Sequence, residues 1–213
     1  MTDQLPRLVL ASASPARLDT LRQAGLQPQV LVSGVDESPT PGESPTALVS
    51  RLATLKAQAV VPQLDREPAF ATTVVVGCDS MLELDGRAYG KPQTADAARE
   101  RWRQMRGRVG TLLTGHHVIV LRGDQDRSLT AVAATTVHFA DLSDTEIDAY
   151  VATGEPLAVA GAFTVDGLGG PFVTRIEGDF HNVVGISLPL LRDLLGDLGF
   201  AWSDLWRPAL KGC

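Results

Sequence analysis

The sequence is short of cysteine and has no long apolar run. Its 213 residues contain 2 cysteines, Cys78 and Cys213, which lie far apart. A disulfide framework or a zinc site needs more ligands at closer spacing, so neither is expected and the cytoplasm is the expected compartment. The amino terminus has no charged segment leading into an apolar run, and no stretch is long enough to cross a bilayer. We therefore predict neither a signal peptide nor contact with a membrane.

Aromatic residues and positive charge are also scarce. Aromatic side chains make up 5% of the chain, and the formal net charge is −6. Proteins that bind nucleic-acid polymers gather Arg and Lys in dense patches, and this sequence has none, so no such polymer is expected as a partner. Hydrophobic residues account for 44%, which is enough for a sizeable core. The composition predicts a globular protein that meets nucleotides, if at all, one at a time.

Lysine is rare. Of the 19 basic residues only Lys56, Lys91 and Lys211 are lysine. An ammonium group is a compact point charge that approaches a phosphate oxygen closely, whereas guanidinium is a planar fork. A chain that uses Arg almost everywhere else and keeps Lys at 56 and 91 is predicted to need an ammonium group there. Chance is the alternative explanation, and it suffices for Lys211 in the tail.

Three consecutive valines, Val74 to Val76, predict a buried strand near the middle of the chain. Asp79 follows after Gly77, which places its carboxylate at the carboxyl end of that strand, where ligands bind in open α/β sheets. Asp85 and Gly86 are typical of a two-residue hairpin turn, which would bring Lys91 back toward Asp79. This stretch predicts a site for metal and phosphate. The alternative is that Asp79 only caps a turn.

A second anion site is predicted near the amino terminus. Residues 7–11 have the pattern of a short strand, and Ser14 and Pro15 are a typical N-cap and first residue of a helix. The free N–H groups and the dipole of a helix amino terminus favour negative charge, and Ser12 and Arg17 add a hydroxyl and a guanidinium. Many capped helices with the same pattern bind nothing.

A longer helix is predicted from Ser44 and Pro45 onward. Lys56 is expected at the edge of its apolar stripe, so that the stem lies along the core while the ammonium group faces a cleft. The predicted stripe consists of Leu48, Leu52, Leu55 and Ala59.

The second half of the chain predicts a helix after Thr94, a long hairpin, a helix after Ser143 and a closing helix from 187 to 195. The segments 109–123 and 128–142 form the hairpin. Its three histidines lack other ligands at metal spacing, so they are interpreted as strand residues. No Walker A motif, nucleophile elbow or covalent nucleophile is evident.

Six ordered motifs resemble the Maf family of nucleoside triphosphate pyrophosphatases, once described as septum-formation inhibitors. They are ASASPARLDTLRQAG near the start, VDE at 35–37, LKA at 55–57, GCDSML at 77–82, GKP at 90–92, and GEPLAVAGAFTVDGLGGPFV followed by NVVGISLPLL. The resemblance covers nearly the whole chain, from Leu8 to about Leu195. It implies an α/β fold like that of inosine triphosphate pyrophosphatases, with a long twisted mixed sheet and two lobes flanking a cleft.

The resemblance also implies a reaction, a cofactor and a partner. A nucleoside triphosphate is hydrolysed to the monophosphate and pyrophosphate with a divalent metal cation, Mg or Mn, often by a homodimer. We therefore expect one Maf-like domain over residues 1–213, with a loosely ordered tail after about residue 200. A role in removing unwanted nucleotides or in arresting cell division belongs to the same expectation.

The same resemblance assigns residues to the site. Asp79 matches the family's catalytic carboxylate, described as a proton acceptor, and Glu37 matches an acidic residue that, with Asp79, holds the metal. Taken by itself, the stretch around Glu37 favours carboxylates that are merely solvated. Lys56 and Lys91 match the basic residues. The serines and arginine of the anion site, Ser12, Ser14 and Arg17, match the family's SxSPRR loop.

Three positions depart from the branches of the family that act on dTTP and UTP or on 7-methyl-GTP. Ala16 replaces the Arg or Trp of those branches, Ser80 replaces Thr or Gln, and Asp166 replaces Gln or Glu in the late glycine-rich loop. The shorter side chains of Ala16 and Asp166 predict a roomier pocket, and a carboxylate at 166 favours base edges that donate hydrogen bonds.

Two other functions compete with the enzyme. A non-catalytic regulator would bind nucleotide or a division protein and halt septation by contact, and a phosphatase acting on sugar phosphates would release orthophosphate. The combination of Asp79, Glu37, Lys56 and Lys91 favours the pyrophosphatase, because a pure binder has little need for a base beside the phosphates.

Overall fold

The computed structural model describes residues 6–64, 72–123 and 125–206. They form a mixed α/β fold around one seven-stranded sheet of order β2-β1-β3-β5-β6-β7, with β4 paired to β3. The parallel pairs are β1 with β2 and β1 with β3, and the other pairs are antiparallel. The expected α/β class with a mixed sheet is confirmed. The strands are β1 (Arg7–Leu10), β2 (Gln29–Val30), β3 (Thr73–Leu84), β4 (Arg87–Tyr89), β5 (Val109–Arg122), β6 (Gln125–Phe139) and β7 (Val173–Glu177).

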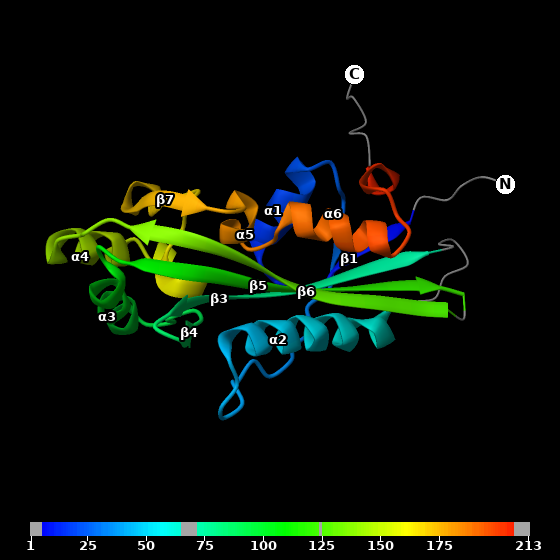
Figure 1. Cartoon of the computed structure of the whole chain (residues 1–213), viewed down its shortest axis with the longest axis horizontal. Helices are drawn as coiled ribbons and strands as arrows, with labels where there is room; N and C mark the ends of the chain where they lie inside the picture. The colour runs from blue at the N-terminus through cyan, green and yellow to red at the C-terminus, as the bar shows by residue number, and fades with distance from the viewer. Residues whose placement is uncertain (1–5, 65–71, 124, 207–213) are drawn as a thin grey trace, which may run out of the picture.

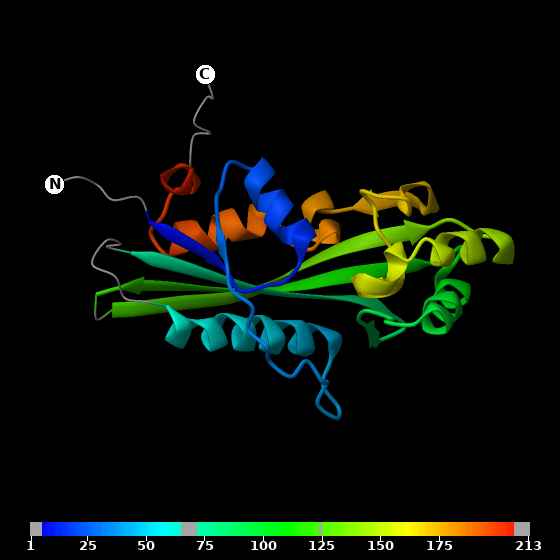
Figure 2. The same cartoon turned by 180° about the vertical axis from the view of Figure 1, so that it is seen from behind.

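Three long strands, β3, β5 and β6, run the length of the molecule (Figure 1). Helices α1 and α6 cover one face of the sheet at one end, α2 covers the opposite face, and α3 and α4 lie together at the other end (Figures 1 and 2). One hydrophobic cluster, which includes Leu10 and Leu195, lies under α1 and α6, and another, which includes Trp102, lies at the α3 and α4 end. The helices are α1 (Pro15–Gln23), α2 (Pro45–Val60), α3 (Ala95–Met105), α4 (Asp144–Ala152), α5 (Phe180–Val184) and α6 (Leu188–Asp197).

Local sequence signals set most helix starts and the first hairpin. The side chains of Ser14, Ser44, Thr94 and Ser143 accept hydrogen bonds from backbone N–H groups in the first turns of α1, α2, α3 and α4. The two-residue turn between β3 and β4 has positive φ at both positions, 52° at Asp85 and 75° at Gly86. These predictions, and the long hairpin of β5 and β6, are confirmed.

The position of Asp79 within its strand was predicted wrongly. The valine strand does not end at Gly77, because β3 continues to Leu84 and Asp79 lies in its middle, paired with Gly115 of β5. The glycine serves close packing. A Cβ at residue 77 would lie 2.3 Å from the carbonyl oxygen of Ala53, so only glycine lets α2 approach β3 this closely.

The apolar stripe of α2 is also shifted from its expected place. Leu55 is exposed, whereas Lys56 is buried on the same face as Leu52 and Ala53. Lys56 therefore lies within the face that packs on the sheet, not at its edge. Its burial is tolerated because the ammonium group has charged partners, which the periodicity of the sequence does not reveal.

The end of the described chain is more regular than expected. Residues Trp202–Leu205 form a 3-10 helix, Leu205 is buried, and the indole of Trp206 donates a hydrogen bond to the carbonyl of Ala24. The loosely ordered tail was therefore placed too early, and residues 207–213 lie outside the described residues. Strand β2 has only 2 residues, and β7 and α5 were not predicted.

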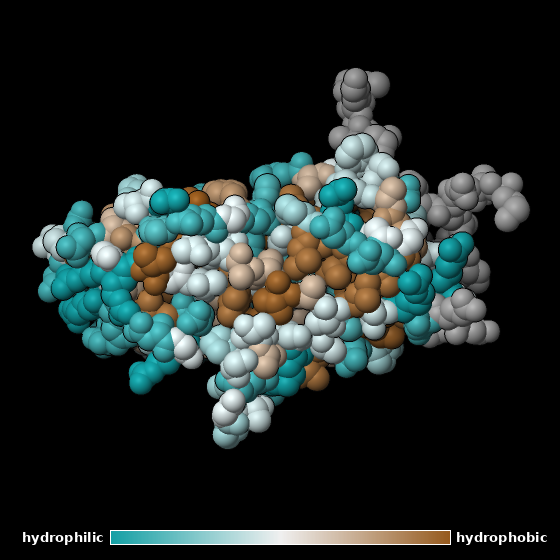
Figure 3. Space-filling model, in the orientation of Figure 1, coloured by the Kyte–Doolittle hydropathy of each residue, from teal (hydrophilic) through white to brown (hydrophobic). Residues whose placement is uncertain are grey.

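The edge of the sheet at β6 carries an apolar band (Figure 3). Within the described residues β6 pairs with β7 only from Thr136 onward, so the part of β6 before it is an edge. Leu129 and Ala131 of β6 and Leu190 of α6 are half-buried and pack on the core here. The band lies on the face seen in Figure 1, whereas α1 and the loop that follows β2 lie on the face seen in Figure 2.

Candidate active site

One pocket of about 640 Å³ brings all ten candidate residues together. Its walls come from the loop between β1 and α1, the loop after β2, α2, β3, the segment after β4, and the turns around residues 158–166 and 183–185. The ten residues are Ser12, Ser14, Ala16, Arg17, Glu37, Lys56, Asp79, Ser80, Lys91 and Asp166. A volume of this size is in the usual range for sites that bind small ligands.

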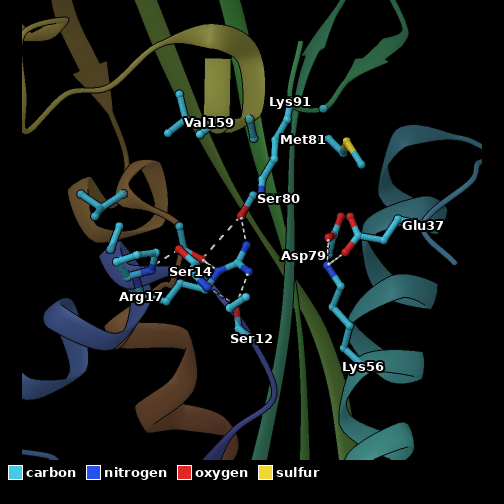
Figure 4. Close-up of a pocket in the computed structure, with 18 of the residues that line it drawn as sticks. Ser12, Ser14, Arg17, Glu37, Lys56, Asp79, Ser80, Met81, Lys91 and Val159 are labelled. Carbon is cyan, nitrogen blue, oxygen red and sulfur yellow. Dashed lines mark hydrogen bonds and ion pairs between the residues drawn. The ribbon is translucent and has the colours of Figure 1, made fainter. Parts of the chain in front are cut away.

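A cluster of three charged side chains lies on one side of the pocket (Figure 4). The Nζ atom of Lys56 lies 2.5 Å from Oδ1 of Asp79 and 2.7 Å from Oε1 of Glu37. Asp79 and Lys56 are buried, whereas Glu37 is exposed. The second carboxylate oxygen of Asp79, Oδ2, is buried and has no hydrogen-bond partner among the described residues. A buried acceptor left unpaired is costly, which is typical of a group reserved for a ligand.

The electrostatics of Asp79 depend on two opposing effects. Burial disfavours the charged carboxylate and raises its pKa above the usual value, while the charges of Lys56 and Arg17 and the hydrogen bond from Lys56 lower it. The first effect is the larger one, so the pKa of Asp79 is raised overall. A carboxylate with a raised pKa is a stronger base than an exposed one, and it accepts a proton more readily.

Two glycines determine how close α2 lies to this cluster. A Cβ at Gly115 of β5 would lie 2.1 Å from the carbonyl oxygen of Val49, and a Cβ at Gly77 of β3 would lie 2.8 Å from the backbone nitrogen of Ala57. At these two positions β3 and β5 have no side chain facing α2, so their backbones lie close to that helix. The close contact brings Lys56 within hydrogen-bond distance of Asp79.

The guanidinium of Arg17 is buried at the other side of the pocket, and the protein accepts hydrogen bonds from four of its five N–H donors. Its nitrogens donate to the carbonyl oxygens of Gly185 at 2.7 Å and Cys78 at 3.0 Å, and to the hydroxyls of Ser12 at 3.0 Å and Ser80 at 2.8 Å. Arg17 thus connects the loop before α1 with β3 and with the turn after α5. This side chain shapes the pocket wall.

The remaining candidates lie around this framework. Ser14 caps α1, and its own backbone N–H donates to Ser12 Oγ at 3.2 Å. Lys91 and Asp166 line the pocket with exposed side chains, and Ala16 is half-buried. Lys91 extends into the pocket above Ser80 (Figure 4). The hairpin turn therefore brings Lys91 to the same pocket as Asp79, as the sequence predicted.

Comparison with known proteins agrees with these motifs. The family described as Maf-like protein matches residues 7–198. This chain belongs to the Maf family. A relative from Cutibacterium acnes is 58% identical over 201 residues, covering 93% of this chain and 94% of that protein, and is named nucleoside triphosphate pyrophosphatase. Relatives with the same name occur in Salinispora tropica, at 57% identity with coverage of 97% and 90%, and in Streptomyces coelicolor, at 54% identity with coverage of 95% and 96%.

The Maf site is consistent with a divalent cation held by few protein ligands. No group of three or more His, Cys, Asp or Glu residues that could enclose a metal occurs in the part of the chain that the structure describes. Asp79 and Glu37 nevertheless supply hard carboxylate oxygens to the pocket. Magnesium is commonly held by one or two carboxylates together with substrate phosphates, so the donor set fits such an ion.

Several residues of the Maf pocket were not singled out from the sequence. Val159, Phe163 and Thr164 line it, and buried Thr114 of β5 contacts the Ser80 hydroxyl with its own hydroxyl at 2.9 Å. Thr114 lies in an alternating strand and gives no local signal. The segment that carries Val159 is part of the longest motif of the resemblance, which is the signal that could have identified it.

None of the helices in residues 6–64, 72–123 and 125–206 combines the length and the apolar character needed to cross a membrane.

Proposed function

We propose that this Maf protein is a nucleoside triphosphate pyrophosphatase, which hydrolyses a nucleoside or deoxynucleoside triphosphate to the monophosphate and pyrophosphate. The observation that carries the proposal is the buried Asp79, which lines the same pocket as Lys56 and Lys91 and whose Oδ2 has no hydrogen-bond partner among the described residues. Relatives with 54–58% identity over nearly the whole chain bear that name, which supports the same reaction here.

In the reaction, a water molecule attacks the α-phosphorus. A bond forms between the water oxygen and the α-phosphorus, the bond from the α-phosphorus to the α,β-bridging oxygen breaks, and pyrophosphate leaves with that oxygen. Asp79 is assigned as the acceptor of the water proton through Oδ2, because this atom is unpaired and the pKa of the group is raised by burial.

The phosphate oxygens need counter-charge as negative charge shifts to the leaving group. We assign this role to the ammonium groups of Lys56 and Lys91, which the chain keeps as lysine where it otherwise prefers arginine. The loop of Ser12 and Ser14 at the amino terminus of α1 adds hydroxyl and backbone donors. Arg17 is assigned a positioning role, since most of its N–H donors are taken by the protein.

A divalent cation, Mg or Mn, belongs to the proposal, with Asp79 and Glu37 as its protein ligands. When bound, such an ion neutralises phosphate charge and lowers the pKa of coordinated water. The ammonium group of Lys56 contacts the same two carboxylates, so it is placed to keep them paired when no cation is present.

The preferred base, a homodimer, a cytoplasmic location, one domain over the whole chain and a role in cell division stay predictions. Ala16, Ser80 and Asp166 line the pocket, which makes each a candidate for contact with the nucleoside. Light scattering on the purified protein tests the dimer directly.

The decisive experiment is a panel of ordinary and modified nucleoside triphosphates, scored for pyrophosphate and for orthophosphate, with Mg or Mn and with chelator. The proposal expects pyrophosphate in equal amount to the monophosphate, and no turnover with chelator. Orthophosphate as the product would point to a phosphatase. Nucleotide binding without release of either product would support the non-catalytic regulator.

A further inference from the structure

A glycine-rich loop, residues 163–169, forms one wall of the pocket, between the 3-10 helices Ala160–Ala162 and Gly170–Phe172. The charged cluster around Asp79 lies across the pocket from Val159, which precedes this loop (Figure 4). Phe163 lines the pocket beside Val159. The proposed triphosphate belongs at the charged side, so the nucleoside faces the apolar side and its glycine-rich wall.

The wall is attached to a carboxylate that does not line the pocket. Glu155 begins the 3-10 helix Glu155–Ala158, and both of its oxygens accept hydrogen bonds from the loop. Backbone N–H groups donate from Leu168 to Oε2 and from Gly169 to Oε1, each at 3.0 Å, and the hydroxyl of Thr164 donates to Oε1. The hydroxyl of Tyr150 in α4 donates to Oε1 at 3.1 Å.

The glycines of the loop are explained by this attachment. A Cβ at Gly167 would lie 2.6 Å from Oε2 of Glu155, and a Cβ at Gly169 would lie 2.4 Å from the hydroxyl of Tyr150. Neither glycine has a positive φ, so steric room around Glu155 and Tyr150 is the reason that these positions lack a side chain. The loop and the carboxylate are built to fit each other.

The carboxylate stays ionised at neutral pH. Burial acts to raise the pKa of Glu155, but the hydrogen bonds from Thr164, Leu168, Gly169 and Tyr150 together outweigh it and lower the pKa below the usual value. An ionised carboxylate offers only acceptors, which matches four donors converging on it. A glutamine at this position would place an NH₂ group against N–H donors.

We infer that Glu155 is a positioning residue that holds the loop of residues 163–169 in place as the wall contacted by the nucleoside. This inference rests on the proposed function for the identity of the ligand, while the attachment itself rests on the hydrogen bonds alone. Loss of the attachment releases the wall without disturbing Asp79 or Lys56 on the other side of the pocket. Nucleotide affinity then falls more than the rate of the chemical step.

The test compares Glu155→Gln with the matched control Glu146→Gln. Glu146 makes a capping box with Ser143 at the start of α4, so its loss also removes carboxylate hydrogen bonds, but at a place that does not touch the loop. For Glu155→Gln we expect faster amide hydrogen exchange at Leu168 and Gly169, and a KM raised about tenfold with kcat changed by less than about threefold. Glu146→Gln should lower thermal stability and leave both readouts as in the wild type.

A second variant keeps the carboxylate and disturbs only the fit. Gly167→Ala places a methyl group against Glu155, so it should raise KM in the same way, and Gly167→Ala in a Glu155→Ala background should add little.

Unchanged exchange at Leu168 and Gly169 in Glu155→Gln would overturn the attachment. Faster exchange in Glu155→Gln with an unchanged KM would overturn the positioning role. The same changes of kcat and KM in Glu155→Gln and Glu146→Gln would overturn it as well. If the wild-type protein hydrolyses no nucleoside triphosphate at all, the proposed function fails, and the exchange measurement still decides the attachment.

Discussion

Lys56 and Asp79 form a buried ion pair in which Nζ lies 2.5 Å from Oδ1, while Oδ2 of the same carboxylate keeps no partner among the described residues. The pairing is asymmetric, since one oxygen is bound by Lys56 and the other is buried without a partner among the described residues. Glu37 contacts the same ammonium group from the exposed side at 2.7 Å. Because the two residues contribute differently, replacing Asp79 and replacing Lys56 are expected to have different effects on activity.

Replacing the proposed base is the most direct test. Asp79→Asn keeps the shape of the side chain but cannot accept the proton from water, so we expect the fold to persist and kcat to fall at least about 100-fold. Circular dichroism and steady-state release of pyrophosphate measure the two effects. Asp36→Asn, which changes an exposed neighbour of Glu37 outside the pocket lining, is the control and should be fully active. Full activity in folded Asp79→Asn would remove the residue from this role.

Lys56 should control the protonation of Asp79 as well as bind phosphate. Its charge lowers the pKa of Asp79 against the effect of burial, so Lys56→Met should raise that pKa further. The acid limb of the kcat/KM profile is then expected to move to higher pH, and activity at neutral pH should drop. Gln58→Met, on an exposed position of the same helix, provides the control. An acid limb that stays in place would show that the pair does not set the titration.

The close contact between α2 and the sheet can be tested through its glycines. In Gly77→Ala the new Cβ would meet backbone atoms of Ala53 and Ala57, which cannot move without shifting the helix. We expect a loss of about 2–3 kcal/mol in the free energy of unfolding, together with a loss of activity as Lys56 moves from Asp79. Gly196→Ala in α6 meets nothing within 4 Å and should be neutral or slightly stabilising. Urea denaturation of both variants would contradict the packing argument if their stabilities were equal.

Stability should depend on pH through His116. Burial lowers the pKa of His116 to about 4, and its Nε2 accepts a hydrogen bond from the backbone N–H of Ser187 at 2.9 Å, which requires the neutral ring. The unfolded chain binds a proton near pH 6.5, so it binds more protons than the folded protein between about pH 6.5 and 4. The stability supplied by neutral His116 is therefore complete above about pH 6.5 and is lost as the pH falls toward 4.

The measurement is the free energy of unfolding against pH for the wild type, His116→Gln and the control His181→Gln, an exposed histidine. The His116 variant should lose part of the pH dependence in this window, and the control should keep it. Parallel curves for all three proteins would contradict the assignment.

The start of α2 and the turn between β3 and β4 could be predicted from the sequence, because neighbouring residues determine them. Ser44 and Pro45 begin α2 where the N-cap preference places its start, and Asp85 and Gly86 make the hairpin because their positive φ values suit that turn. Such features depend on neighbours in the sequence, so the sequence alone was sufficient for them.

The arrangement around Asp79 could not be predicted in the same way. A carboxylate after three valines and a glycine is typical of a strand end, but the antiparallel partner β5 extends the strand well past it. The sequence predicts Lys56 at the edge of a stripe because it follows Leu55, and the carboxylates of Asp79 and Glu37 make its burial possible. Both corrections come from partners that are distant in sequence.

Arg17 has a consequence for redesign of the protein. The guanidinium donates hydrogen bonds to Ser12, Cys78, Ser80 and Gly185, so a single side chain holds together three segments that are far apart in sequence. A library that varies position 80 to change base preference also changes the hydrogen bond between Arg17 and Ser80. A variant at position 80 can therefore lose turnover through a displaced Arg17 while it still recognises the base. Selections for new substrates should therefore begin at Ala16 and Asp166, which line the pocket and whose side chains take no part in the hydrogen bonds of Arg17.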